Sequence, residues 1–290
     1  MENLRGSLLM VASMLCFAIE DMFVKLLASH LPVGQILLLI GLTGAICFAA
    51  MARLRGVRLQ VRHLVMPQVL LRNLFEMCGT IFFVCAIAFT PISQASAIQQ
   101  ATPLVVTLGA ALFLQEKVGW RRWTAILVGF VGVLIIVRPG TQAFSVLSLL
   151  AVASVIGLAA RDVVTRQIPA SISSLQLGAY GFSALIPVGV ILLVVLEQHP
   201  VEMDGMQITQ LLLASAFGVA GYYMLIWAVR IGQISVITPF RYTRLIFALI
   251  IGVVVFGETV DATTLIGGAV VVASGLYSLW RQTLRGRMAE

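Results

Sequence analysis

Charge is scarce in this sequence. Only 11% of its residues are Asp, Glu, Lys or Arg, whereas a typical soluble domain has about 25%. Hydrophobic residues make up 60% of the chain, and the mean hydropathy is +1.04. A soluble fold of 290 residues could not hide this much apolar surface. At about 20 residues per membrane span, the chain has room for about ten helices and none for a soluble domain.

Signatures of catalysis are also missing. The sequence has no Walker loop, no HExxH motif and no GxSxG motif. Its histidines, which do not form a cluster, are His30, His63 and His199. Its cysteines, all inside apolar runs, are Cys16, Cys47, Cys78 and Cys85. That placement argues against a disulfide framework or a metal cluster. We therefore predict no enzyme activity, no metal and no cofactor.

A charged, apolar stretch occurs twice in the chain. Residues 7–25, SLLMVASMLCFAIEDMFVK, return at residues 148–166 as SLLAVASVIGLAARDVVTR. Eight of the nineteen aligned positions are identical at an offset of 141, and both copies end in a basic residue, Lys25 or Arg166. The stretch is long enough to span a membrane, so the duplication predicts two equivalent charged helices.

A second repeated block gives the length of the duplicated unit. At an offset of 142 the matched pairs are Ser93 and Ser235, Gln99 and Arg241, Thr102 and Arg244, and Glu116 and Glu258. Two blocks at nearly equal offsets predict a five-helix unit that occurs twice, over residues 1–141 and 142–290. Because five is odd, the two copies must cross the membrane in opposite directions. Such inverted repeats are a recurring plan of secondary transporters.

The apolar runs and the turn residues between them predict ten membrane-spanning helices. In the first half these helices cover residues 6–28, 32–52, 66–89, 92–115 and 122–138. In the second half they cover residues 146–167, 175–196, 207–229, 233–256 and 261–280. The predicted fold class is therefore an all-α membrane protein.

The distribution of basic residues predicts the orientation. With a cytoplasmic N-terminus, the inward segments hold fourteen Lys or Arg residues, and the outward loops hold only Arg138 among bases. The acids of the outward loops are Glu197, Glu202, Asp204, Glu258 and Asp261. Cytoplasmic loops carry the excess of Lys and Arg in membrane proteins. Both termini are therefore predicted to be cytoplasmic, in a multi-pass protein of the bacterial inner membrane.

Seven ionisable side chains lie well inside the predicted spans: Glu20, Asp21, Lys25, Arg72, Glu76, Arg241 and Arg244. Each costs roughly 2.5–3.5 kcal/mol on insertion scales, so such groups usually face the bundle interior or a water-filled cavity. Pairs at i,i+4 spacing, which can meet on one helix face, are Asp21 with Lys25, Asp162 with Arg166, and Arg72 with Glu76. We interpret these as structural ion pairs, although the depth of Glu76 leaves a functional role equally open.

The remaining charges need partners from other helices or from a ligand. Glu20 has no helical partner of this kind, and Arg241 repels Arg244 at i,i+3 spacing. We expect Arg244 to contact Glu76 or Glu20, and either acid to serve as the proton site of a coupled transporter. The predicted substrate-binding residues are Glu20, Glu76, Gln99, Tyr223, Arg241 and Arg244.

The fourth predicted helix carries an unusual number of polar side chains around a proline. They are Ser96, Gln99, Gln100 and Thr102, next to Pro103. This pattern is typical either of a bend beside a cavity or of ordinary hydrogen bonds between helices.

These features resemble the drug/metabolite transporter superfamily, specifically the EamA-type ten-helix carriers. In the first copy the resemblance rests on Ala101-Thr102-Pro103-Leu104 through Phe113-Leu114-Gln115-Glu116, and on Gly119-Trp120-Arg121-Arg122-Trp123 through Arg138-Pro139-Gly140. In the second it rests on Pro239-Phe240-Arg241-Tyr242-Thr243-Arg244-Leu245 through Phe256-Gly257-Glu258. The resemblance implies two inverted five-helix repeats with cytoplasmic termini, around a cavity lined mainly by the first, third, fourth, sixth, eighth and ninth helices. Members of the family move amino acids, nucleotide precursors, vitamins and other small metabolites.

Together these observations predict a secondary transporter that moves a small polar metabolite across the inner membrane by alternating access. The seven intramembrane charges sum to +1, which favours a carboxylated or zwitterionic, amino acid-like solute. The alternative hypothesis is a non-transporting membrane component, either an enzyme or an accessory subunit. We expect a small-molecule solute and the lipid bilayer as partners, allow for a homodimer, and expect no nucleic-acid partner.

Overall fold

The computed structural model describes residues 2–115, 118–141, 144–165, 167–169, 171–231 and 237–289. The helices of the first half are α1 (Glu2–Ala28), α2 (Val33–Leu54), α3 (Val61–Leu64), α4 (Pro67–Phe89), α5 (Ile92–Gln99), α6 (Thr102–Phe113) and α7 (Trp120–Val137). Those of the second half are α8 (Ser148–Thr165), α9 (Ser174–Val195), α10 (Gly205–Ile231), the 3₁₀ helix η1 (Thr238–Tyr242), α12 (Thr243–Phe256) and α13 (Ala262–Ala289).

Local signals in the sequence set several of these helix ends. Pro67 occupies the first position of α4, where its missing N–H has no helical partner to lose. Ser173 and Gln176 form a reciprocal capping box at the start of α9. Gly257 ends α12 with a φ of +62°, a left-handed conformation that glycine adopts without a steric penalty.

Eight helical segments of the described chain are long and apolar enough to cross a membrane. Shorter apolar segments at Trp123–Val137 in α7 and Ala262–Ser278 in α13 occupy the places of the fifth and tenth predicted spans. The short helix α3 lies in the basic segment between α2 and α4, where the sequence indicated only a loop. The structure is therefore an all-helical, multi-pass arrangement over the described residues.

The fourth predicted span is interrupted. Helix α5 ends at Gln99 and α6 begins at Thr102, so residues 100 and 101 separate them. Pro103 has no N–H to donate to the carbonyl group of Gln99, and the Thr102 hydroxyl donates to that carbonyl instead, at 2.7 Å. The backbone around the interruption uses tighter bonds, such as Ala101 N–H to the carbonyl group of Ile98 at 3.0 Å.

The ninth predicted span is also irregular, because Pro239 lies in the 3₁₀ helix η1, which runs directly into α12. The predicted start of that span, residues 233–236, lies outside the described residues. The offset of 142 between Gln99 and Arg241 places both irregular segments at corresponding points of the two repeats.

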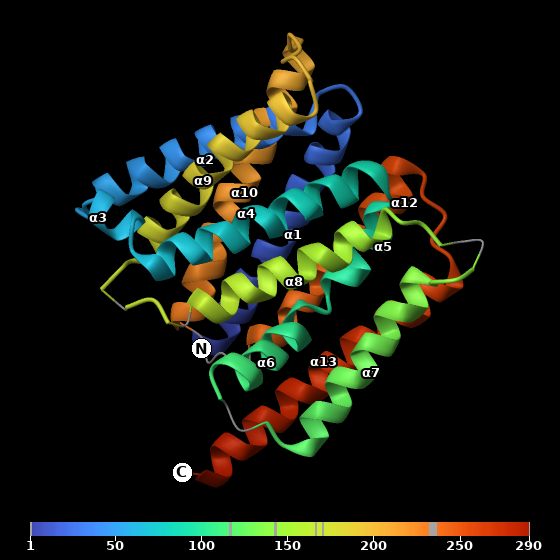
Figure 1. The fold of residues 1–290 in the computed structure, drawn as a ribbon. Coiled ribbons are helices and arrows are strands. Elements are labelled where there is room, and N and C mark those ends of the chain that lie inside the picture. The colour runs from blue at the N-terminus through green and yellow to red at the C-terminus, as the bar shows by residue number, and fades with distance from the viewer. Residues whose placement is uncertain are drawn as a thin grey trace.

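The helices pack in pairs that join the two halves of the chain. α1 packs against α10, α2 against α9, α4 against α8, and α7 against α13. In Figure 1, α2 and α9 lie at one end of the molecule, α7 and α13 at the other, and α4 and α8 between them. By the repeat offsets, α8 corresponds to α1 and α10 to α4, so the α4–α8 pair corresponds to the α1–α10 pair. In each of the other two pairs, the two helices that pack together correspond to each other. A pseudo-two-fold axis relating the repeats would produce this pairing.

Candidate functional site

A cavity of about 620 Å³ lies between the helices. Its size is within the range of small-molecule sites. Among the described residues, its lining comes from α1, α2, α4, α5, α6, α8, α9, α10, η1 and α12, whereas α7 and α13 lie outside it. The interruption after α5 contributes Gln100, Thr102 and Pro103 to the wall. The bend therefore places polar side chains beside a cavity, one of the two alternatives left open by the sequence.

The charged residues that line the cavity are balanced. The acids are Glu20, Asp21, Glu76 and Asp162, and the bases are Arg72, Arg161, Arg241 and Arg244. With all eight ionised, the lining has no net charge. The earlier sum of +1 included Lys25, which does not belong to the lining. The wall therefore offers acidic and basic groups in equal number.

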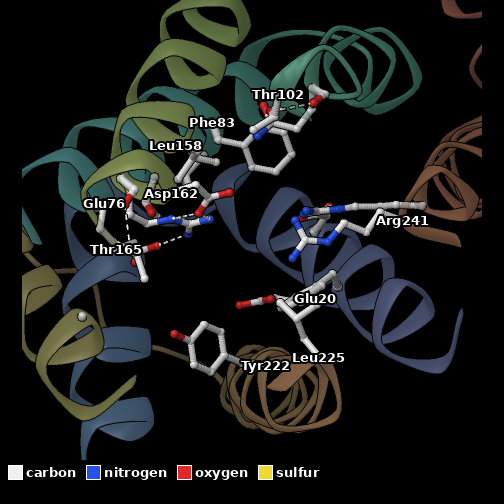
Figure 2. A pocket seen from close by; sticks show the side chains of 18 of the residues that line it. Glu20, Glu76, Phe83, Thr102, Leu158, Asp162, Thr165, Tyr222, Leu225 and Arg241 are labelled. Atoms are coloured by element: carbon white, nitrogen blue, oxygen red, sulfur yellow. Dashed lines mark hydrogen bonds and ion pairs between the residues drawn. The ribbon is translucent and has the colours of Figure 1, made fainter. Parts of the chain in front are cut away.

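One group of four charges on α4 and α8 is paired within itself, and we call it the α4/α8 charge cluster. Glu76 forms ion pairs with Arg72 and with Arg161, the latter at 2.6 Å between Oε1 and Nη1. Arg161 also pairs with its neighbour Asp162 at 2.8 Å. Arg72 is 3% exposed and donates to the side chain of Asn73. Figure 2 shows Glu76 and Asp162 of this cluster on one side of the pocket, with dashed contacts between the residues drawn.

Arg244 is held in place by three neighbours. Its Nη2 and Nε atoms lie 2.7 Å and 3.2 Å from Oδ2 of Asp21. Its guanidinium carbon lies 5.3 Å from the ring centre of Phe17 and 5.2 Å from that of Phe83, within cation–π range. Arg244 is therefore fixed between two aromatic rings and a buried carboxylate, which is 6% exposed.

Glu20 and Arg241 differ from the other six charges. Neither forms a hydrogen bond or an ion pair with any residue that the structure describes. The Glu20 carboxylate instead lies against the backbone of Gly218 on α10. Figure 2 shows Glu20 and Arg241 entering the pocket opposite Glu76 and Asp162, with Tyr222 below. The cavity thus presents one acid and one base that make no hydrogen bond or ion pair within the described part of the chain.

A polar network lies beyond the cavity lining at one end. Lys25 pairs with Glu258 at 3.2 Å and donates to the carbonyl group of Thr90 at 2.6 Å. The Glu258 carboxylate accepts from the Ile92 amide at 2.7 Å, and from the Ser93 amide and hydroxyl at 3.1 Å and 2.6 Å. It therefore caps the N-terminus of α5 from the other half of the chain. We call these five residues the Lys25–Glu258 network.

The position of the network follows from the order of residues along three helices. On α1 the cavity lining ends at Val24, and Lys25 comes next. On α4 it ends at Ile87, and Thr90 follows in the same direction. On α5 it begins at Gln99, well after Ser93. The network therefore lies beyond the cavity on each helix, and fully buried apolar side chains, including Leu27, Ile36 and Ile92, lie near that end of the same bundle.

The environment of Glu258 favours its charged form. Burial alone would raise its pKa, but hydrogen bonds from Ser93 and Ile92 and the charge of Lys25 outweigh burial. They hold the pKa of this carboxyl group below its usual value. Glu258 follows the spanning segment of α12, so it caps α5 as a carboxylate near neutral pH.

The profile of the EamA-like transporter family matches this chain twice, at residues 4–138 and 146–280. The chain belongs to the EamA-like transporter family. A riboflavin transporter of Vibrio cholerae is 26% identical and covers 98% of this chain and 96% of its own length. An S-adenosylmethionine uptake transporter of Rickettsia felis is 24% identical, over 73% of this chain and 71% of its own. A pseudopaline exporter of Pseudomonas aeruginosa is 26% identical, over 93% of this chain and 94% of its own.

A solved crystal structure aligns with 98% of this chain and 98% of its own, at a TM-score of 0.66 and 17% identity. That likeness shows the fold alone. The family and its named relatives make this EamA-like chain a multi-pass membrane transporter of a small metabolite rather than an enzyme.

Five of the six predicted substrate-binding residues of this EamA-like chain line the cavity: Glu20, Glu76, Gln99, Arg241 and Arg244. Tyr223 is outside the lining, and its hydroxyl group accepts a hydrogen bond from Arg55 at 2.5 Å. Tyr222 lines the cavity instead. Successive residues of a helix point about 100° apart, so a cavity wall that takes one tyrosine turns the next one away.

The predicted structural ion pairs are found in part. Arg72 pairs with Glu76 as expected. Asp21 binds Arg244 rather than Lys25, and Lys25 binds Glu258. The i,i+4 spacing would let Asp21 and Lys25 pair with each other. Arg244 and Glu258 instead come close enough to bind them separately. Asp162 binds Arg161, while its expected partner Arg166 lies outside the described residues. The expected contact of Arg244 with Glu20 or Glu76 is replaced by its contact with Asp21.

Sequence reasoning missed two features of the site. Arg161 was not among the predicted site residues, yet it lines the cavity and pairs with Glu76. Glu258 was counted as an outward loop charge, yet it caps α5. The repeat matched Glu258 with Glu116 and Ser93 with Ser235, and nothing in those matches pointed to a contact between Glu258 and Ser93.

Proposed function

We propose that this chain is a secondary transporter of a small zwitterionic, amino acid-like metabolite, working by alternating access in the bacterial inner membrane. One observation carries the proposal: Glu20 and Arg241 line the cavity as opposite charges, and neither makes a hydrogen bond or an ion pair with a described residue. An unpaired charge is costly away from water, so a solute that pairs with both groups is strongly favoured. Arg241 would bind the solute carboxylate, and Glu20 its ammonium group.

We further propose that ten spans form two inverted repeats, residues 1–141 and 142–290, with both termini in the cytoplasm. Three observations support this arrangement: the two family matches, the pairing of corresponding helices, and the excess of basic residues in the inward segments. In this orientation the Lys25–Glu258 network closes the periplasmic end of the cavity. The described conformation would then be closed to the periplasm.

Glu20 is the better candidate for proton coupling. Both Glu20 and Glu76 were candidates from the sequence, but Glu76 is engaged by Arg72 and Arg161. A proton on Glu20 would remove an unpaired negative charge when the solute is absent, and the solute ammonium group would replace that proton. The coupling ion is therefore proposed to be a proton that competes with the solute for Glu20.

Counterflow in proteoliposomes tests the function. The panel contains amino acids, S-adenosylmethionine, pseudopaline and riboflavin, because the names of the relatives indicate both uptake and export of such compounds. We expect counterflow of solutes that carry an ammonium group and a carboxylate, and none of riboflavin. Glu20→Gln and Arg241→Gln should each lower counterflow at least about tenfold, the loss of one charge-assisted hydrogen bond.

Arg55→Gln is the matched control, since Arg55 lies outside the cavity lining and binds Tyr223. It should leave counterflow unchanged. Full counterflow by both cavity variants would refute the site. A purified chain that moves no panel solute and retains one fixed protein partner would favour the accessory-subunit alternative.

A further inference from the structure

The two repeats make the same helix crossing twice. On one side α8 crosses α4, and a Cβ atom on Gly157 would lie 2.8 Å from Cα of Gly79. On the other side α1 crosses α10, and a Cβ atom on Gly221 would lie 3.2 Å from Cβ of Cys16. Gly157 follows Cys16 by 141 residues, and Gly221 follows Gly79 by 142. The same two repeat positions therefore touch at both crossings.

One helical turn from each crossing, the two sides differ in chemistry. On the α4/α8 side, Glu76 and Arg161 form the 2.6 Å ion pair. The repeat offsets place Glu20 at the position of Arg161, and Gly218 at the position of Glu76. The positions that hold the Glu76–Arg161 ion pair at one crossing thus hold Gly218 and Glu20 at the other.

The glycine also determines where the Glu20 carboxylate lies. A Cβ atom on Gly218 would come 2.4 Å from Oε1 of Glu20 and 2.7 Å from its carboxyl carbon. No real Cβ atom approaches an oxygen that closely, so any side chain at this position would displace the carboxylate. Gly218 offers Glu20 no side-chain partner and lets the carboxylate lie against α10 in the cavity wall.

We infer that Gly218 is the positioning residue of a subsite for the cationic group of the solute. The solute's ammonium group occupies the role that a protein side chain fills in the Glu76–Arg161 pair of the other repeat. The inference rests on the proposed function, and it adds that selectivity for the cationic group depends on residue 218. A side chain there should weaken binding of the ammonium group and leave binding of the carboxylate at Arg241 intact.

The experiment uses matched triplets of an amino acid, its des-amino acid and its decarboxylated amine, beginning with L-leucine, isocaproate and isoamylamine. Binding is measured by competition against counterflow in proteoliposomes and by thermal shift of the purified full chain. For Gly218→Ala, we expect affinity for the amino acid and the amine to fall at least about tenfold, as for a displaced charge-assisted hydrogen bond. Affinity for the des-amino acid should stay unchanged.

Gly221→Ala is the matched control. Gly221 lies three residues further on α10, at the same crossing, and contacts Cys16 and Phe17 rather than Glu20. A general change of helix spacing would alter all three compounds alike in both variants, and that result would overturn the inference. Selective loss in Gly218→Ala, without selective loss in Gly221→Ala, supports it.

Two double variants connect the effect to Glu20. Gly218→Ala should cause no further loss of amine binding in a Glu20→Gln background. In a Glu20→Asp background, the shorter side chain withdraws the carboxylate from α10, so the same substitution should cost less than in the wild-type chain. Equal losses in all backgrounds would contradict the inference.

The failure of this inference can be told from the failure of the proposed function. If no amino acid of any triplet binds the wild-type chain, the proposed function fails. If amino acids bind and Glu20→Gln abolishes selectivity for the amine, but Gly218→Ala retains it, only the role of Gly218 fails.

Discussion

Arg241 and Arg244 show how neighbours decide the role of a residue. The two arginines are three residues apart, and both line the cavity. Arg244 is bound to Asp21 and stacked between Phe17 and Phe83, so its hydrogen-bonding capacity is partly used by the protein. Arg241 has no such contacts with the described residues. We therefore propose that Arg241 binds the solute and that Arg244 has a structural role.

The two arginine variants should separate affinity from stability. Arg241→Gln should lower solute affinity about tenfold to a hundredfold, since a hydrogen bond to a charged group contributes about 1.5–3 kcal/mol. Arg244→Gln should lower the free energy of unfolding by about 3–5 kcal/mol, because it leaves the buried Asp21 carboxylate unpaired. Competition binding and denaturant unfolding in detergent measure the two quantities. An Arg244→Gln chain with wild-type stability and reduced affinity would reverse the assignment.

For single residues, the sequence identified the residues that line the cavity more reliably than it identified their ion-pair partners. Charges inside apolar runs are visible without a structure, so Glu20, Glu76, Arg241 and Arg244 were predicted as site residues and do line the cavity. Their partners depend on helix crossings, which spacing along one helix does not determine. The pairing of Asp21 with Arg244 joins residues 223 positions apart, and no i,i+4 rule reaches it.

Helix α5 depends on the other half of the chain for its N-terminal cap. Pro91 precedes it and provides no side-chain hydrogen bond, so the amides of Ile92 and Ser93 are bound by Glu258. A carboxylate at a helix N-terminus also interacts favourably with the helix dipole. The start of α5 and the end of α12 are thus fixed to each other, and Lys25 adds α1 to the same junction.

This cap should depend on pH. The pKa of Glu258 is lowered in the folded chain, so its stabilising contribution is complete above the usual carboxyl pKa of about 4.3 and is lost as pH falls through the lower folded value. Glu258→Gln should therefore lower Tm near neutral pH, and its difference from the wild-type chain should shrink in strong acid. Thermal unfolding over a pH series measures this. A difference in Tm that is independent of pH would contradict the role of the carboxylate.

Helix ends were predictable because they coincide with the ends of apolar runs. The predicted span 66–89 is found as Pro67–Phe89, and 175–196 as Ser174–Val195. The interruption after Gln99 was less visible, since Pro103 alone does not say whether a helix bends or breaks. The outcome depends on the Thr102 hydroxyl, which takes the place of the missing proline N–H.

At the scale of the whole molecule, the duplicated frame has been kept while its chemistry has diverged. The repeat was readable from the sequence because Asp21 and Asp162 still correspond, but Glu20 now stands where the other copy has Arg161. One crossing carries the internally paired α4/α8 charge cluster, and the other carries Glu20, which has no ion pair among the residues that the structure describes. One wall of the cavity is thus held by ion pairs between α4 and α8, and the other offers the Glu20 carboxylate. We propose that a reversibly bound ligand pairs with this carboxylate.

The proposed alternating access requires that the end of the cavity at the Lys25–Glu258 network can open, and we propose that this network breaks when it does. Val24 is the last lining residue before the network and is 3% exposed. On a background without native cysteines, Val24→Cys should react slowly with a membrane-impermeant maleimide added to spheroplasts. Adding Lys25→Met should increase that rate several-fold, because the substitution removes the ion pair and the bond to Thr90.

His30→Cys, at an exposed position beyond the same end of α1, controls for access of the reagent and should react equally in both backgrounds. Unchanged labelling of Val24→Cys upon loss of Lys25, with His30→Cys reactive in both, would show that the buried apolar side chains at this end, rather than the network, keep it closed.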